Sequence, residues 1–176
     1  VDGKPVVFIY NPRPRTLDEW RGMLESLRGQ GLAATWLVQP MSEGTLWDKP
    51  EVLAGHLAVF DGLYDFGING YTPEQMRARL ANGKRALAAA GRPDGLWSAG
   101  ITVGYLGNAN SFYRPYLNTG TLRANWEAAV ATGAPWVCLT TWNDYVENTH
   151  FEPSAVNRDA LLRINRDLVA RWRGAP

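Results

Sequence analysis

Several features that would point to common protein functions are missing from this sequence. There is one cysteine, Cys138, so no disulfide can form within the chain, and no apolar run approaches the roughly 20 residues that a membrane-spanning helix needs. The 18 basic and 17 acidic residues nearly cancel and leave a net charge of +1. Such a balance does not indicate the excess of positive charge that binds nucleic acid or an anionic membrane, so neither partner is expected.

The sequence also lacks the motifs that bind phosphate groups or activate a serine nucleophile. Its glycines fit neither the GxGxxG pattern nor the P-loop spacing, and there is no GxSxG turn. No motif implies an organic cofactor, and a nucleophilic triad is not favoured. Cys138 lies in an apolar run without basic neighbours, which indicates a buried small side chain rather than a nucleophile.

What the sequence does contain is sufficient for one ordinary folded domain. It has 176 residues, 45% apolar and 20% charged, so we predict a single α/β domain over residues 1–176. Eight Trp and seven Tyr are many for this length, and such rings can stack on the flat apolar faces of sugars. The first residue is Val1 rather than Met, so we expect a processed chain or a piece of a longer one.

Short apolar runs alternate with longer amphipathic segments along the chain. We predict strands at residues 5–10, 34–38, 59–66, 96–103 and 136–141. Helices are predicted at residues 16–29, 50–57, 72–90, 122–132 and 155–172. Thr16 with Glu19, and Thr72 with Gln75, have the spacing of capping boxes. About five β–α units favour a parallel sheet covered by helices, either an open five-stranded doubly wound sheet or part of a (β/α)8 barrel.

Polar and aromatic side chains follow every predicted strand, and this is where the active sites of both folds lie. Candidates for binding a substrate there are Tyr10, Asn11, Asp65, Asn69 and Tyr105. One polar loop would indicate only a solvated surface. Five such loops at one end of a sheet favour a shared polar and aromatic cleft.

The densest of these segments is TTWNDYVENTHFEPS, which runs from Thr140 to Ser154 directly after the last predicted strand. Asp144 and Glu147 are three positions apart, so both carboxyl groups can face one cavity. Two carboxyl groups in different surroundings can serve as acid and base, which is what glycoside hydrolysis requires. Further substrate-binding candidates in this segment are Trp142, Asn143, Tyr145, His150 and Glu152.

Two other interpretations of this segment stay open. In the first, Asp144 only caps the following turn and Glu147 is solvated, so that neither carboxylate takes part in chemistry. In the second, a divalent cation is bound through the oxygen and nitrogen atoms of Asp144, Glu147, His150 and Glu152. Those four residues are compressed into one loop and show no recognised ligand spacing.

The segment TWNDYVENTHFEP resembles the TWNDYGES signature of the endo-α-1,3-glucanases of glycoside hydrolase family 71. It is also similar to the NEWHEGTQIEP signature of the endo-α-mannosidase group, family 99. Upstream, GKPVVFIY resembles the fourth barrel strand of those enzymes, FDGLYDFG their sixth, and NWEAAVATGAPWVCLTTWNDY the segment leading into their eighth. The resemblance implies the C-terminal part of a (β/α)8 barrel, without the first three β–α units. The missing segment, or a second copy, would then be a partner.

In those families the two acids of the last motif are the catalytic pair, and the matching positions are Asp144 and Glu147. The resemblance implies a glycoside hydrolase acting on an α-linked polysaccharide, either α-1,3-glucan or α-mannan, with Glu147 as general acid and Asp144 as base. Asp144 follows the glucanase pattern, whereas Thr149 and the pair Glu152-Pro153 follow the mannosidase pattern. The alternatives are a non-catalytic carbohydrate-binding or incomplete barrel fragment, and a metal-dependent hydrolase.

Overall fold

The structure is a computed structural model, and it describes residues 1–40, 49–66, 72–107 and 113–174. The chain divides into two compact units, and each is described by itself. The first unit consists of residues 1–65 and 78–99, and the second of residues 66–77 and 100–176. Helix α3 (Pro73–Ala89) and strand β4 (Trp97–Thr102) each pass from one unit into the other. The main sheet has the strand order β1-β2-β3-β4-β7.

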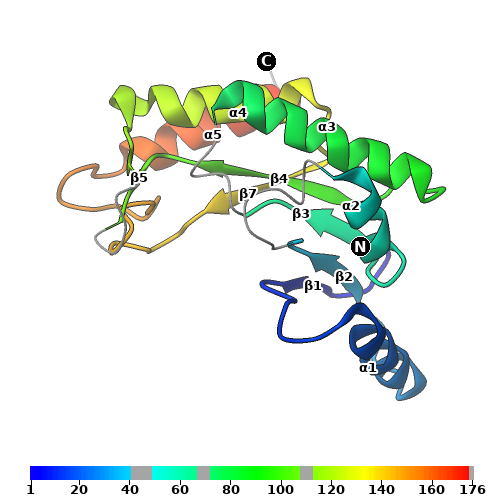
Figure 1. Cartoon of the computed structure of the whole chain (residues 1–176). Helices are drawn as coiled ribbons and strands as arrows, with labels where there is room; N and C mark the ends of the chain where they lie inside the picture. Colours follow the sequence, from blue (N-terminus) through cyan, green and yellow to red (C-terminus); the bar gives the residue numbers. More distant parts are fainter. Residues whose placement is uncertain (41–48, 67–71, 108–112, 175–176) are drawn as a thin grey trace. The chain divides into compact units, whose positions relative to one another are not determined.

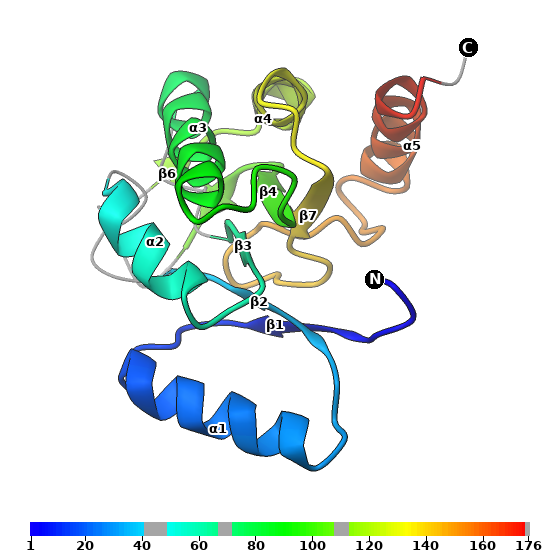
Figure 2. The same ribbon diagram turned by 90° about the vertical axis from the view of Figure 1, so that its right-hand side faces the viewer.

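The first unit holds the beginning of the main sheet. Its elements are β1 (Val6–Ile9), α1 (Leu17–Gly29), β2 (Thr35–Val38), α2 (Pro50–Leu57) and β3 (Gly62–Tyr64), with most of α3 and the start of β4. β1 pairs with β2, β2 with β3, and β3 with β4, and all three pairings are parallel. Helix α1 lies next to β1 (Figures 1 and 2). The predicted α/β class with parallel strands is therefore confirmed.

Helix starts in this chain follow from local chemistry. The hydroxyl of Thr16 accepts the backbone N–H of Glu19 at 3.2 Å, and the Glu19 carboxylate accepts the backbone N–H of Thr16 at 2.7 Å. Thr72 and Gln75 make the same reciprocal pair at 3.3 and 2.8 Å. Both predicted capping boxes are confirmed, and each satisfies two backbone donors that the first turn of a helix leaves open.

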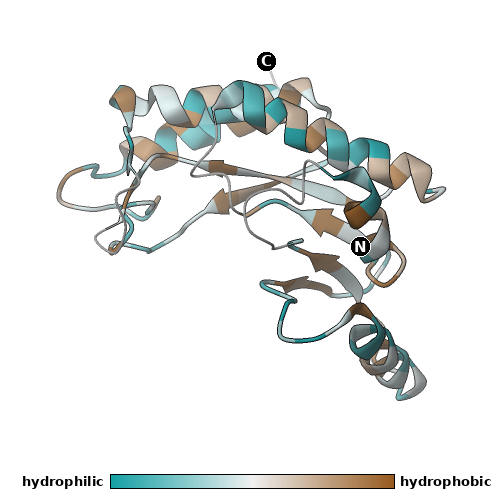
Figure 3. Cartoon of the chain, viewed as in Figure 1, coloured by the Kyte–Doolittle hydropathy of each residue, from teal (hydrophilic) through white to brown (hydrophobic). Residues whose placement is uncertain are grey.

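The core of the first unit includes seven Leu and Phe side chains with at most 1% of their surface exposed. They are Leu24, Leu37, Leu53, Phe60, Leu63, Leu80 and Leu87. Each contributes about 1.5–3 kcal/mol by leaving water. Helix α1 is amphipathic in Figure 3, and its Trp20 packs against Phe60 with ring centroids 5.6 Å apart. At Gly62 a Cβ would lie 2.1 Å from the Leu96 carbonyl oxygen, so this close approach requires glycine.

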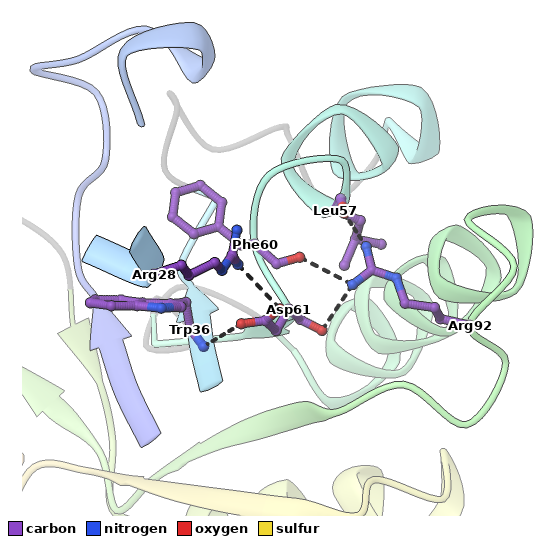
Figure 4. Close-up of polar contacts among 6 residues, drawn as sticks. All are labelled: Arg28, Trp36, Leu57, Phe60, Asp61 and Arg92. Atoms are coloured by element: carbon purple, nitrogen blue, oxygen red, sulfur yellow. Dashed lines mark hydrogen bonds and ion pairs between the residues drawn. The ribbon is translucent and has the colours of Figure 1, made fainter. Parts of the chain in front are cut away.

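A polar cluster fixes the amino ends of β2 and β3 (Figure 4). The carboxylate of Asp61 accepts the backbone N–H of Trp36 at 2.8 Å and pairs with Arg28 at 3.6 Å. Arg92 donates to the carbonyl oxygen of Asp61 at 3.2 Å and to that of Leu57, the last residue of α2. A cation that binds the last carbonyls of a helix also interacts favourably with the helix dipole. The cluster therefore holds the turn between α2 and β3.

The second unit holds the end of the sheet and the small hairpin. Its elements are β5 (Tyr105–Leu106), β6 (Tyr113–Arg114), the 3-10 helix η2 (Leu117–Thr119), α4 (Gly120–Ala131), β7 (Trp136–Thr140) and α5 (Ala160–Trp172). Helices α4 and α5 lie side by side (Figure 2), where the rings of Trp126 and Trp172 meet at 5.9 Å. The indole N–H of Trp126 donates to the side chain of Asn165 at 3.1 Å. No helix in the described ranges is long and apolar enough to cross a membrane.

The structure corrects several predicted boundaries. Strand β3 covers only residues 62–64, because the chain still turns after α2, with the N–H of Phe60 donating to the His56 carbonyl at 2.9 Å. The last helix begins at Ala160 instead of residue 155, because residues 154–158 form a turn closed by the Arg158 N–H and the Ser154 carbonyl at 2.7 Å. The hairpin of β5 and β6 was not predicted. Cys138 in β7 is partly buried, and burial raises the pKa of its thiol, which disfavours a thiolate nucleophile.

Candidate active site

The loop that follows β7, residues 141–153, carries most of the predicted site residues and is called the motif loop. The backbone N–H of Thr141 donates to the Thr149 carbonyl at 3.0 Å, and their hydroxyls are 2.8 Å apart. The backbone N–H of Phe151 donates to the Thr141 carbonyl at 3.0 Å. Thr149 and Phe151 are at most 1% exposed. These hydrogen bonds join the two ends of the loop, and the buried side chains of Thr149 and Phe151 anchor it. The exposed residues of the loop are thereby held in one arrangement.

Asp144 and Glu147 lie together on this frame. The backbone N–H of Asp144 donates to the Thr141 hydroxyl at 3.1 Å, and the backbone N–H of Glu147 donates to the Asp144 carboxylate at 2.9 Å. Asp144 therefore caps the turn, as the structural interpretation of the sequence expected. Both acids are half-buried. Capping engages one oxygen of the Asp144 carboxylate, and a carboxylate has capacity for several further hydrogen bonds.

Glu147 is also tied to the hairpin. The hydroxyl of Tyr105 donates to the Glu147 carboxylate at 3.3 Å, and the N–H of Leu106 donates to the Glu147 carbonyl at 2.9 Å. The Asn148 side chain donates to the Leu106 carbonyl at 3.0 Å. Tyr105, a residue predicted from the end of another strand, thus contacts one of the two candidate catalytic acids.

The aromatic residues of the motif loop present open faces. Trp142 is 53% exposed and Tyr145 is 49% exposed. The Tyr145 hydroxyl donates to the Glu152 carboxylate at 2.5 Å, a hydrogen bond that raises the pKa of Tyr145. The ring of Tyr145 also packs on that of His150, with centroids 4.4 Å apart. Because Tyr145 is held from two sides, it offers a fixed apolar face on which a sugar ring can stack.

The carboxylates of the motif loop have no cationic partner in the part of the chain that the structure describes. The ion pairs found there involve other acids, and none reaches Asp144, Glu147 or Glu152. Among the same residues, no group of three His, Cys, Asp or Glu side chains could hold a metal ion. The alternative interpretation, with Asp144, Glu147, His150 and Glu152 as metal ligands, is therefore not supported by a ligand cluster in the described structure.

Three of the remaining predicted residues, Tyr10, Asn11 and Asp65, belong to the first unit. Tyr10 follows β1 and is 56% exposed. Asn11 adopts a left-handed backbone with φ 51° and accepts a hydrogen bond from the Arg13 side chain at 2.9 Å. Asp65 follows β3, is completely buried and forms an ion pair with Arg79 at 3.3 Å. Its carboxylate is thus engaged in a structural contact. Asn69 lies outside the described residues.

Two kinds of site residue were missed by the sequence analysis. Thr141 and Thr149 form the frame of the motif loop, and Tyr116 donates its hydroxyl hydrogen to the Asn148 carbonyl. The tyrosine contact joins positions 32 residues apart, so no local pattern could reveal it. The two threonines lie within the motif and are eight positions apart, directly after a strand. This spacing is the one feature of the sequence that could have indicated their contact.

Comparison with known proteins shows the fold of the chain. No protein-family model matches the sequence, and no curated protein matches it either. Among solved structures, the GH99 endo-α-mannosidase from Bacteroides thetaiotaomicron in complex with Bis-Tris propane is similar with a TM-score of 0.80 and 18% identity over 99% of this chain. A second structure of the endo-α-mannosidase from that organism gives a TM-score of 0.75 and 22% identity, again over 99% of this chain.

The likeness establishes an α/β fold that corresponds to part of a (β/α)8 barrel, as in these two structures. The predicted barrel class is therefore confirmed over the open doubly wound sheet. The chain spans 59% and 56% of the lengths of these two neighbours. At 18–22% identity the likeness concerns the fold, and the chemistry has to be argued from the residues of this chain.

Proposed function

We propose that this chain is a glycoside hydrolase that cleaves an α-linked polysaccharide, with Asp144 and Glu147 as its carboxylate pair. The observation that carries the proposal is their arrangement in the motif loop. The two acids are linked through the Glu147 N–H and the Asp144 carboxylate at 2.9 Å, and neither has a cationic partner among the described residues. Two uncompensated carboxyl groups beside exposed aromatic rings are the groups that glycoside hydrolysis needs.

In this proposal each residue has one role in the reaction. Glu147 donates a proton to the glycosidic oxygen as the bond to the anomeric carbon breaks, and Tyr105 orients its carboxyl group. Asp144 accepts a proton, either from an attacking water or from the sugar's own 2-hydroxyl, so the pair serves inversion or retention. Trp142 and Tyr145 stack on sugar rings.

The residues of the motif loop support two α-linked substrates. The Asp at position 144 follows the α-1,3-glucanase pattern, and Thr149 with Glu152 follows the α-mannosidase pattern. The solved neighbours are endo-α-mannosidases, which adds support for α-mannan. Both polymers therefore belong in the first assay.

A second candidate function is glycan binding without hydrolysis. It is favoured by the share of the neighbours that this chain spans, 56–59%, because residues from the rest of a barrel also line the active sites of such enzymes. In that case Trp142 and Tyr145 would still bind sugar, and Glu147→Gln would leave the affinity unchanged.

The experiment is an assay of product release from α-1,3-glucan, α-mannan and a β-glucan control. Glu147→Gln should lower turnover by a factor of about 100 to 10,000, the range that general acid catalysis contributes. Asp144→Asn should behave likewise, since its amide oxygen can still accept the Glu147 N–H while no longer acting as base. The matched controls are Glu25→Gln and Asp94→Asn, both on exposed positions.

The outcomes separate the two candidates. Turnover of one α-glycan that survives both controls and disappears in Glu147→Gln supports hydrolysis. Undiminished turnover in Glu147→Gln contradicts the assignment of the general acid. Binding without turnover in the folded wild-type chain supports the second candidate. A chelator should leave turnover unchanged, and inactivation by it would favour a metal-dependent hydrolase instead.

A further inference from the structure

A pocket of about 540 Å³ lies in the second unit beside the motif loop, whose residues Asn148 and His150 form part of its lining. Its polar wall is formed by Tyr116, Asn118, Thr119, His150 and Asn157, and its apolar wall by residues of α5 that include Leu161. Asp144, Glu147 and Trp142 do not line it. The volume falls in the range of about 300–1,000 Å³ typical of small-molecule sites. We call this cavity the His150 pocket.

His150 is the residue of this pocket that the fold leaves unexplained. Its side chain is 7% exposed, and neither ring nitrogen has a hydrogen-bond partner among the described residues. A buried polar group without a partner is costly, and such groups in native structures call for an explanation. Both nitrogens are shielded from bulk solvent. Neither nitrogen is open to the pocket in this ring orientation, so a ligand in the pocket becomes a partner of His150 only when the ring turns about its Cβ–Cγ bond.

The chemistry of the lining favours a neutral, hydroxylated ligand. The described residues that line the pocket include no Lys, Arg, Asp or Glu. The amide groups of Asn118 and Asn157 and the hydroxyl of Thr119 offer both donors and acceptors, and a neutral imidazole offers one of each. Hydroxyl groups of a sugar are donors and acceptors in the same way, while Leu161 faces the apolar surface of the ring.

An anion is less suited to this place. Helix α5 begins at the pocket, and its N-cap Asp159 makes no side-chain hydrogen bond to the first turn. The amide donors of that turn could attract an anion, but the Asp159 carboxylate stands at the same helix start and is exposed together with its partner Arg163. A neutral ligand can use those donors without repulsion from a carboxylate.

We propose that the His150 pocket binds a hexose unit, as an accessory sugar site separate from the Asp144–Glu147 pair. The pocket and the pair are joined through Asn148, which lines the pocket, accepts the Tyr116 hydroxyl and directly follows Glu147. A sugar held there would anchor a glycan next to the loop that carries the general acid. The identity of the ligand as a sugar rests on the proposed function.

The test uses the full chain with Glu147→Gln, so that turnover cannot interfere with binding. The nitrogen signals of the His150 ring are followed by NMR while α-1,3-glucobiose or α-1,3-mannobiose is added, and inorganic phosphate serves as the anionic comparison. Ala160→Leu fills the pocket from the first residue of α5. Ala155→Leu is the matched control, because Ala155 is exposed and does not line the pocket.

One of the disaccharides is expected to shift the His150 signals. Ala160→Leu should weaken its binding at least about tenfold, the effect of losing one or two well-placed hydrogen bonds, and Ala155→Leu should not change it. His150→Phe keeps the ring packing on Tyr145 while removing both nitrogens, and it should weaken binding similarly without unfolding the chain.

The proposal is overturned if neither disaccharide moves the His150 signals, if Ala160→Leu and Ala155→Leu bind equally well, or if only phosphate moves them. Its failure can be told apart from that of the proposed function. If the wild-type chain cleaves a glycan but no sugar shifts the His150 signals, only the proposed accessory site is rejected. If a sugar shifts the His150 signals but the chain cleaves no glycan, the hydrolase function is rejected and the sugar site stands.

Discussion

Two acids beside the strands of the first unit and the two acids of the motif loop have different hydrogen-bond and ion-pair partners. In the first unit Asp61 pairs with Arg28, and Asp65 pairs with Arg79 in a contact where the side chains are 0% and 5% exposed. In the second unit the carboxylates of Asp144 and Glu147 accept hydrogen bonds from neutral groups of the described residues, the Glu147 N–H and the Tyr105 hydroxyl. No cation pairs with either acid in the described part of the chain.

If the proposed function holds, this difference separates acids that stabilise the fold from acids that take part in catalysis. A carboxylate beside an arginine has its charge compensated. A carboxylate without a cationic neighbour keeps its charge uncompensated, and its remaining lone pairs can accept hydrogen bonds from a ligand. Both Asp65 and Asp144 follow a strand of the sheet, so position at a strand end alone does not distinguish an acid in an ion pair from one without a cation.

The largest effect should come from breaking the buried pair in the first unit. Arg79→Met leaves the Asp65 carboxylate buried without its cation, and the free energy of unfolding should fall by about 3–5 kcal/mol. Urea denaturation measures this. Arg77→Met on the same helix removes an exposed pair with Glu74 and should cost less than about 1 kcal/mol. If the two variants were equally stable, the Asp65 contact would not be a structural one.

The elements that sequence analysis predicted well are those fixed by neighbouring residues. Helices α1 and α3 begin where Thr16 and Thr72 place a capping box, since all the atoms involved lie within four positions. The apolar runs that become β1, β2, β4 and β7 are long enough to indicate buried strands. The fold class follows from this alternation.

What could not be predicted depends on contacts across long stretches of sequence. Tyr105 and Glu147 are 42 positions apart, and the hairpin that brings them together has strands of only two residues each. Asp65 and Asp144 look alike in the sequence, and only the packing of Arg79 distinguishes them. The prediction of one domain over residues 1–176 stays a prediction, because the chain divides into two units that are described separately.

A moderate effect is expected from the neutral contact in the second unit. Tyr105→Phe removes the hydroxyl that donates to Glu147, a bond worth about 1 kcal/mol. If the proposed function holds, kcat should fall about fivefold while KM changes little, because the lost bond orients the acid and does not bind substrate. Tyr113→Phe on the exposed strand β6 is the matched control. A change in KM alone would assign Tyr105 to substrate binding.

The smallest expected effect is a change of stability with pH, and it comes from one of the two histidines. Like the carboxylates, the two histidines differ in their hydrogen-bond partners. His56 in the first unit is buried, and its Nδ1 lies 2.9 Å from the Val52 carbonyl, whereas His150 in the second unit has no partner in the described residues. Burial lowers the pKa of His56 below its ordinary value of 6.5, and the hydrogen bond to Val52 opposes this in part.

The sign of the resulting pH dependence follows from this lowered pKa. Below pH 6.5 His56 takes up a proton more readily in the unfolded chain than in the folded chain. The contribution of the neutral His56 to the free energy of unfolding is therefore fully present above pH 6.5 and is lost as the pH falls below this value. We expect the free energy of unfolding to fall more in the wild type than in His56→Leu between about pH 8 and about pH 5.5. Chemical denaturation at both pH values measures the difference. Equal losses in the two proteins would show that His56 is no more costly to protonate in the folded chain than in the unfolded chain, and the first unit would then tolerate a buried positive charge that has only the Val52 carbonyl as a partner.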